Sequence, residues 1–191
     1  MQYAVKGAGL AILLAVISQA AFAQREVKPP ETFYANAEVL GQDAGASAYV
    51  TIHIEKYTDE RNRKTMTEAL RTGGYPAFLP ALRAAPDIGW VEMNGRKVVA
   101  RWARQQPTEK GRTISVVTDA PLAFVGGGNV DAKPRAGYEL AIIQMNVDSI
   151  GLGSGSMAAA ARVRPGGPTG VEIDDYAEKP IRLATIRKSY K

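Results

Sequence analysis

Turn signals recur along this chain at roughly ten-residue spacing, and they separate short apolar, β-branched segments. The clearest signal is Asn94-Gly95, which stands between two such segments. Both residues tolerate positive φ, so the pair favours a two-residue hairpin. We expect strands at 33–40, 46–57, 88–93, 97–104, 112–118, 138–147, 152–163, 171–176 and 181–188. A mainly β fold follows, an antiparallel up-and-down barrel or sandwich of about 8–9 strands.

Two of these segments predict how the strands are buried. In 46–57, Val50, Ile52 and Ile54 alternate with polar residues, as in a strand with one buried face. Segment 138–147 is apolar on both faces. It is therefore expected to be a central strand that is covered on both sides.

The segment over about 58–85 changes to helical spacing. Thr58 can cap a helix, and acidic residues follow where the helix dipole favours them. Gly73-Gly74 is expected to end this helix, and Pro76 can open a second, short one. We therefore predict a short two-helix insertion between the second and third strands.

The first 23 residues read as a secretory signal peptide. Lys6 supplies the positive start, an uncharged apolar run follows, and Ala21-Phe22-Ala23 is a small-x-small cleavage site. We expect an exported protein, periplasmic or extracellular, without a transmembrane segment after cleavage. Residues 24–32 are expected to be a flexible lead, and 33–191 a single β domain.

Composition excludes several classes of site. The chain has no cysteine, which removes thiol nucleophiles and thiolate metal sites. Its net charge of +5 is interspersed and accompanies no nucleic-acid-binding module. The single histidine, His53, cannot build a multi-histidine site, and the acids Glu172, Asp174 and Asp175 lack the spacing of a calcium loop. We predict no catalytic residue, no metal site and no cofactor.

One long connection, 119–137, interrupts the pattern of short turns. Loops of this length in compact domains often close over a ligand. Our first functional hypothesis is a non-catalytic protein that binds a small apolar ligand in the interior or mouth of the barrel. The predicted contacts are Leu122, Phe124, Tyr138 and Trp102.

A second hypothesis concerns basic residues on two successive hairpins. Arg96, Arg101, Arg104 and Arg112 can form the interaction face of an envelope-associated module that binds a protein or a polyanion. They can also protect strand edges, which we favour. A hydrolase that uses carboxylates is the third hypothesis and ranks last. Enzyme activity and oligomeric state are left open.

Five segments also resemble a known group of proteins. They are Ile52-His53-Ile54-Glu55-Lys56-Tyr57-Thr58, Tyr75-Pro76-Ala77-Phe78-Leu79-Pro80-Ala81-Leu82-Arg83, Arg101-Trp102-Ala103-Arg104-Gln105, Val117-Thr118-Asp119-Ala120-Pro121-Leu122 and Ile181-Arg182-Leu183. In this order they resemble a family of small secreted bacterial proteins of unknown function. The resemblance implies one secreted domain. It brings no activity, ligand or site residue.

Overall fold

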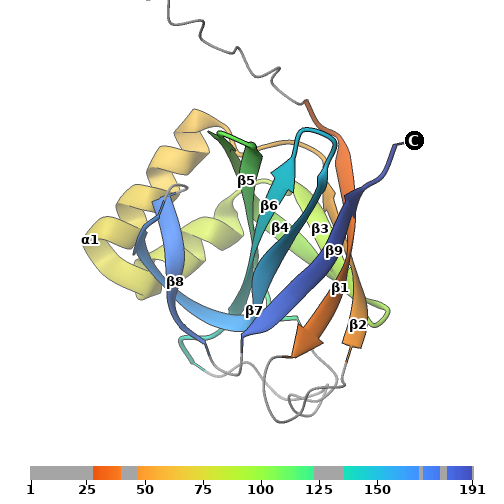
Figure 1. The fold of residues 1–191 in the computed structure, drawn as a ribbon. Helices are drawn as coiled ribbons and strands as arrows, with labels where there is room; N and C mark the ends of the chain where they lie inside the picture. Colours follow the sequence, from red (N-terminus) through yellow and green to blue (C-terminus); the bar gives the residue numbers. More distant parts are fainter. Residues whose placement is uncertain (1–27, 40–46, 123–135, 168–169, 177–179, 191) are drawn as a thin grey trace, which may run out of the picture.

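The computed structural model describes residues 28–39, 47–122, 136–167, 170–176 and 180–190. Nine strands and one helix follow one another in these ranges (Figure 1). They are β1 (Glu31–Val39), β2 (Ser47–Ile54), α1 (Glu60–Ala84), β3 (Gly89–Met93), β4 (Arg96–Thr108), β5 (Gly111–Thr118), β6 (Leu140–Asp148), β7 (Leu152–Gly166), β8 (Gly170–Tyr176) and β9 (Ile181–Lys188). The predicted strands are all present, with ends shifted by a few residues.

Eight of the strands close into an antiparallel barrel. Their order is β6-β5-β4-β3-β2-β1-β9-β7, and β7 pairs again with β6. The eighth strand in sequence, β8, pairs with β7 and continues the sheet outside the barrel. The barrel alternative is thus confirmed, and the structure does not support the sandwich.

The hairpin at Asn94-Gly95 has the predicted geometry. Both residues have positive φ, 53° for Asn94 and 75° for Gly95, and the pair joins β3 to β4. This handedness matches the twist of the flanking strands, which explains why the turn fixes their register. Met93 accordingly lies opposite Arg96.

Apolar side chains from all eight strands fill the lumen. Phe33, Ile52, Ile114, Ile143 and Met145 have no accessible surface. A side chain that borders a void wide enough for water keeps some accessible surface, so no such void adjoins these five residues. The lumen beside them is therefore packed as a protein core.

The helix α1 covers a second core on the outside of the barrel (Figure 1). Its residues Met66, Leu70 and Phe78 pack with residues of β4 to β8, and β8 lies alongside the helix. Both faces of β6 are buried, in the lumen on one side and beneath α1 on the other, as its sequence predicted. Leu140 and Ile142 are the residues of β6 that lie under the helix.

The break expected at Gly73-Gly74 is present as a kink at Gly74 (φ 63°, ψ −160°), which divides α1 into two helical segments. One detail of the predicted insertion is corrected. Asp59, not Thr58, caps its start, because the Asp59 carboxylate accepts the Asn62 N–H at 2.8 Å. The Thr58 hydroxyl instead accepts the Ala103 N–H at 2.9 Å and ties this end of α1 to β4.

Candidate functional site

The residues predicted to contact an apolar ligand lie in different parts of the fold. Leu122 is in the lumen core, and its N–H donates to the Ala159 carbonyl at 2.9 Å. Trp102 is fully buried on the opposite face of the sheet, beneath α1. Tyr138 donates its hydroxyl to Asp175 on β8. Phe124 lies outside the described residues. Leu122, Trp102 and Tyr138 therefore do not line one pocket.

The four arginines likewise do not share one face. Arg96 is exposed at the β3–β4 hairpin, and Arg104 is half-buried. Arg101 donates to Asp119 at 2.9 Å and to Asp87, so ion pairs already hold it. Arg112 is 9% exposed and lies inside the barrel. Edge protection does not explain them either, because β4 and β5 are each paired on both sides.

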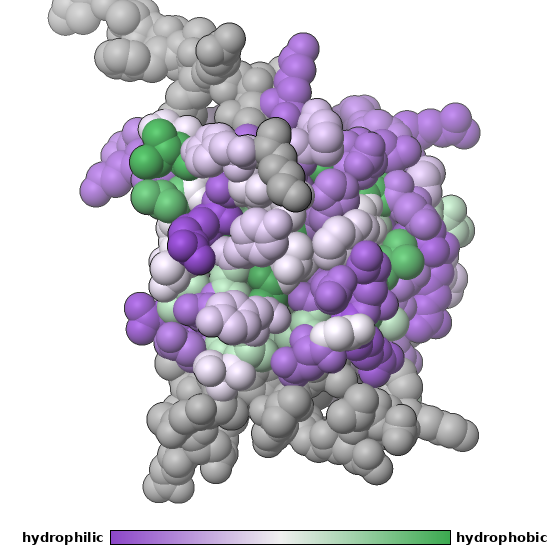
Figure 2. Space-filling view, turned by 90° about the vertical axis from the view of Figure 1, so that its right-hand side faces the viewer, coloured by the Kyte–Doolittle hydropathy of each residue, from purple (hydrophilic) through white to green (hydrophobic). Residues whose placement is uncertain are grey.

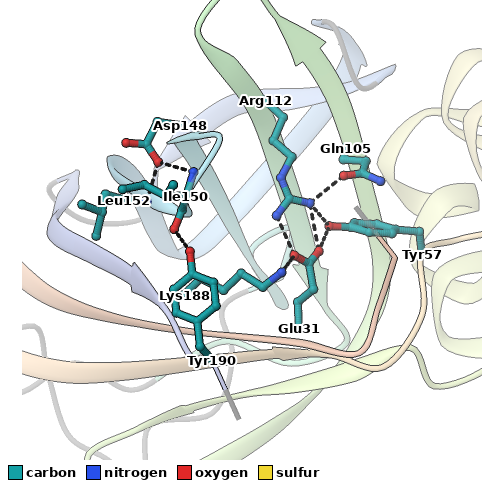
Figure 3. Close-up of polar contacts among 9 residues, drawn as sticks. All are labelled: Glu31, Tyr57, Gln105, Arg112, Asp148, Ile150, Leu152, Lys188 and Tyr190. Atoms are coloured by element: carbon teal, nitrogen blue, oxygen red, sulfur yellow. Dashed lines mark hydrogen bonds and ion pairs between the residues drawn. The ribbon is translucent and has the colours of Figure 1, made fainter. Parts of the chain in front are cut away.

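Arg112 belongs to an ionic cluster that closes one end of the lumen (Figure 3). We call Glu31, Tyr57, Gln105, Arg112 and Lys188 the inner ion cluster. The Glu31 carboxylate has no exposed surface and accepts hydrogen bonds from Arg112 at 2.6 and 2.9 Å. Lys188 at 2.8 Å and Tyr57 at 2.7 Å complete its shell, and Arg112 also donates to Gln105 at 2.6 Å. The cluster thus joins β1, β4, β5, β9 and the segment after β2.

The electrostatics of the cluster fix its protonation states. Burial alone would raise the pKa of Glu31, but the hydrogen bonds from Arg112, Lys188 and Tyr57 outweigh burial and hold that pKa below its ordinary value. Burial and the neighbouring Glu31 charge raise the pKa of Tyr57. Glu31 is therefore ionised and Tyr57 neutral near pH 7. A carboxylate with four such donors is a poor base and nucleophile, so this arrangement suits structure rather than catalysis.

Beside the inner ion cluster, the β6–β7 turn carries apolar residues to the surface (Figure 3). Asp148 accepts the N–H groups of Ile150 at 3.0 Å and Leu152 at 2.9 Å, and Tyr190 donates to the Ile150 carbonyl. Ile150 is 57% and Leu152 45% exposed. The turn is thus rigidly held although its side chains face solvent.

The outer wall formed by β9, β1, β2 and β3 carries aromatic and basic side chains. This side of the molecule is mostly hydrophilic (Figure 2). We define the tyrosine–arginine face by Tyr34, Tyr49, Trp90, Arg182 and Arg187. Tyr49 is 83% exposed and Tyr34 43%. In the ladder, Tyr34 lies opposite Arg187 on one side and Thr51 on the other, while Tyr49 lies opposite Asn36. The two tyrosines are therefore diagonal neighbours, roughly 7–8 Å apart at the backbone.

Trp90 is the fixed part of this face. Its ring stacks on His53, with centroids 5.2 Å apart, and Lys97 Nζ lies 4.0 Å from the ring centroid. His53 is held in turn by Thr32 at 2.9 Å and Glu55 at 3.1 Å. These contacts leave Trp90 half-buried and hold the ring in place.

Other candidates give no functional geometry. A small pocket beside the start of α1 includes Asp59 and Arg101, but the helix cap and the ion pairs already engage both side chains. On β8, Glu172 and Asp174 are paired with arginines of β7. Among the described residues, no three histidine, cysteine or acidic side chains gather as metal ligands. Within the same ranges, no helix combines the length and apolar character needed to cross a bilayer.

Sequence reasoning missed the tyrosine–arginine face, although one signal for it was present. The alternation predicted for 46–57 puts Tyr49 and His53 on the side of β2 opposite Val50, Ile52 and Ile54, as the structure has them. Tyr34 lies on the preceding strand β1, but Arg187 lies far away in the sequence, and only barrel closure brings β9 beside β1. No family model, curated protein or solved structure matches this chain. The family resemblance therefore stays a prediction.

Proposed function

We propose that this protein is an exported, non-catalytic binding module that holds a polysaccharide chain on the tyrosine–arginine face. The observation that carries the proposal is the pair of neighbouring tyrosine rings on the outer wall of a closed barrel. Tyr49 exposes 83% of its surface and Tyr34 43%, although both extend from strands whose other face is fully packed. Exposed aromatic groups that cluster on a rigid surface commonly mark a binding site.

The surroundings of the rings favour a sugar over a protein partner. A sugar ring presents an apolar C–H side that packs on an aromatic ring, and hydroxyl groups at its edge. Asn36 and Thr51 stand opposite the two tyrosines and supply amide and hydroxyl groups for such an edge. The centres of protein–protein interfaces are more apolar than this. The exposed aliphatic Leu152 lies directly opposite Arg187 on β7, with Ile150 at the adjoining turn, so these two residues border the arginine side of the face and not the tyrosine pair.

The packed lumen argues against the first sequence-based hypothesis. An apolar ligand inside the barrel needs space, and Phe33, Ile114 and Met145 leave none beside them. The hydrolase hypothesis has similarly little support, since Glu31, Glu172 and Asp174 are each engaged by arginine. The outer wall is thus the best-supported binding surface of the described residues.

Affinity electrophoresis through gels that contain soluble polysaccharides tests the proposal. The protein should be retarded by at least one of a panel of neutral and acidic polymers, and Tyr49→Ala should weaken that binding about tenfold, the scale of losing one aromatic anchor. Tyr190→Ala is the matched control, because Tyr190 is 73% exposed but lies off this face. Equal losses in the two variants, or no retardation by any polymer, would contradict the proposal.

A further inference from the structure

We infer that the bound polysaccharide is anionic, and that Arg182 and Arg187 of β9 each bind one of its acidic groups. This inference rests on the proposed function and names the chemical class of its ligand. Both arginines are exposed on the outer wall, in the same surface as the tyrosine rings. Arg187 lies directly opposite Tyr34, so a charged contact and a stacking contact adjoin.

Neither guanidinium has an ion-pair partner within the described part of the chain. No ion pair or hydrogen bond joins Arg182 or Arg187 to another described side chain, in contrast to Arg101, Arg112 and Arg162. Glu38 stands opposite Arg182 on β1, but the two do not form an ion pair. Two unpaired guanidinium groups on one strand are suited to carboxylate or other acidic groups of a ligand.

A backbone irregularity places both arginines on the outside. Side chains alternate along a strand, so residues five apart, like 182 and 187, normally face opposite ways. The ladder between β1 and β9 shifts register between Tyr34 and Asn36, and Thr185 adopts a φ of 52°. This bulge reverses the alternation, so that Leu183 and Ile186 both reach the lumen core.

The conformation at the bulge is costly, which indicates that it has a role. A β-branched residue at positive φ is a genuine outlier, and strained backbone is concentrated at functional sites. Bulges also commonly re-aim a side chain beside a site. Without the bulge, the side chain at position 187 would face the lumen. The strained bulge at Thr185 thus turns Arg187 outward and places it beside Tyr34.

The charge of the polymer can be varied without changing its sugar. Polygalacturonate and its fully methyl-esterified form share one backbone and differ in carboxylate charge, so they are the two probes. We expect the wild-type protein to bind polygalacturonate at least about tenfold more tightly than the ester, with a preference that weakens as salt rises. Arg182→Gln/Arg187→Gln should lower binding of polygalacturonate to the level of the ester.

The matched control is Arg61→Gln/Arg71→Gln, which also removes two positive charges, from exposed positions on α1. It should keep the preference for polygalacturonate, and a loss in this control equal to that of Arg182→Gln/Arg187→Gln would overturn the inference. Equal binding of the two polymers by the wild-type protein would overturn it as well, but would leave the proposed function standing. Binding of neither polymer would overturn both.

A third probe separates sugar recognition from charge alone. Polyglutamate carries carboxylates but has no sugar ring to stack on Tyr34 or Tyr49. We expect it to bind more weakly than polygalacturonate, and Tyr49→Ala should not affect it. Polyglutamate binding as tight as that of polygalacturonate would show that the face recognises any acidic polymer, including an acidic protein, and would overturn the inference.

Discussion

Glu31→Ala is expected to destabilise the barrel by about 3–5 kcal/mol, the range for removing one partner of a buried ion pair. The Glu31 side chain has no exposed surface, and it accepts four hydrogen bonds from Arg112, Lys188 and Tyr57 at 2.6–2.9 Å. Each bond to a charged group contributes about 1.5–3 kcal/mol, and these contributions overlap because one carboxylate receives them all. The larger part of the loss is the Arg112 charge left at the lumen end without its partner.

The assay is urea unfolding followed by tryptophan fluorescence, since Trp102 is fully buried between the barrel and α1. With a slope of about 1–3 kcal/mol per molar urea, the midpoint should fall by more than about 1 M. A domain of this kind has a total stability of about 5–15 kcal/mol, so the variant loses a large fraction of it.

Glu92→Ala is the control for this experiment. Glu92 forms an ion pair with Lys97 at 3.7 Å on the surface, where both side chains are partly exposed. Removal of such a pair costs between zero and about 1 kcal/mol. If the midpoints for Glu31→Ala and Glu92→Ala shift by the same amount, the inner ion cluster does not stabilise the barrel and the reasoning is refuted.

Three further predictions use the same unfolding assay. Because the folded state lowers the pKa of Glu31, the stability that this carboxylate contributes is present above its unfolded pKa of about 4.3 and is lost as the pH falls through its folded pKa. The difference in stability between the wild-type protein and Glu31→Gln should therefore shrink on acidification. A difference that stays constant with pH would contradict this. Thr185→Gly should raise stability by up to about 1 kcal/mol, because glycine adopts positive φ without strain; a clear loss would show that the bulge is not strained. Gly153→Ala should cost about 1–3 kcal/mol, because the added Cβ would lie 1.9 Å from the Asn146 carbonyl oxygen; unchanged stability would mean that β6 and β7 can separate.

The fold could be predicted from the sequence because its determinants are local. Alternation in β2, the two apolar faces of β6 and the Asn94-Gly95 turn each report on a few neighbouring residues. The helix start was misassigned by one residue because Thr58 and Asp59 are both good caps. Only contacts with β4 decided between them, where Thr58 binds Ala103.

The inner ion cluster could not be predicted, because its members meet only when the barrel closes. Glu31 and Arg112 are 81 residues apart, and Glu31 was assigned to a flexible lead although it belongs to β1. A weaker signal was available. Arg112 is in phase with the buried Ile114, and Glu31 with the buried Phe33. When a charged residue takes the next inward-facing position after the apolar residues of a strand, its side chain is expected at the end of the lumen.

Closure by β9 has a consequence for the order of folding. This strand lies between β1 and β7, so the barrel cannot close until β9 (Ile181–Lys188) is available to pair with both. Until then β1 and β7 present open edges, and such edges are templates for aggregation. Pairing of β1 with β9 spans most of the chain, and such non-local contacts fold slowly, in milliseconds to seconds. The unfolded chain is therefore most vulnerable before β9 has paired, when a chaperone that covers these two edges would be of greatest use.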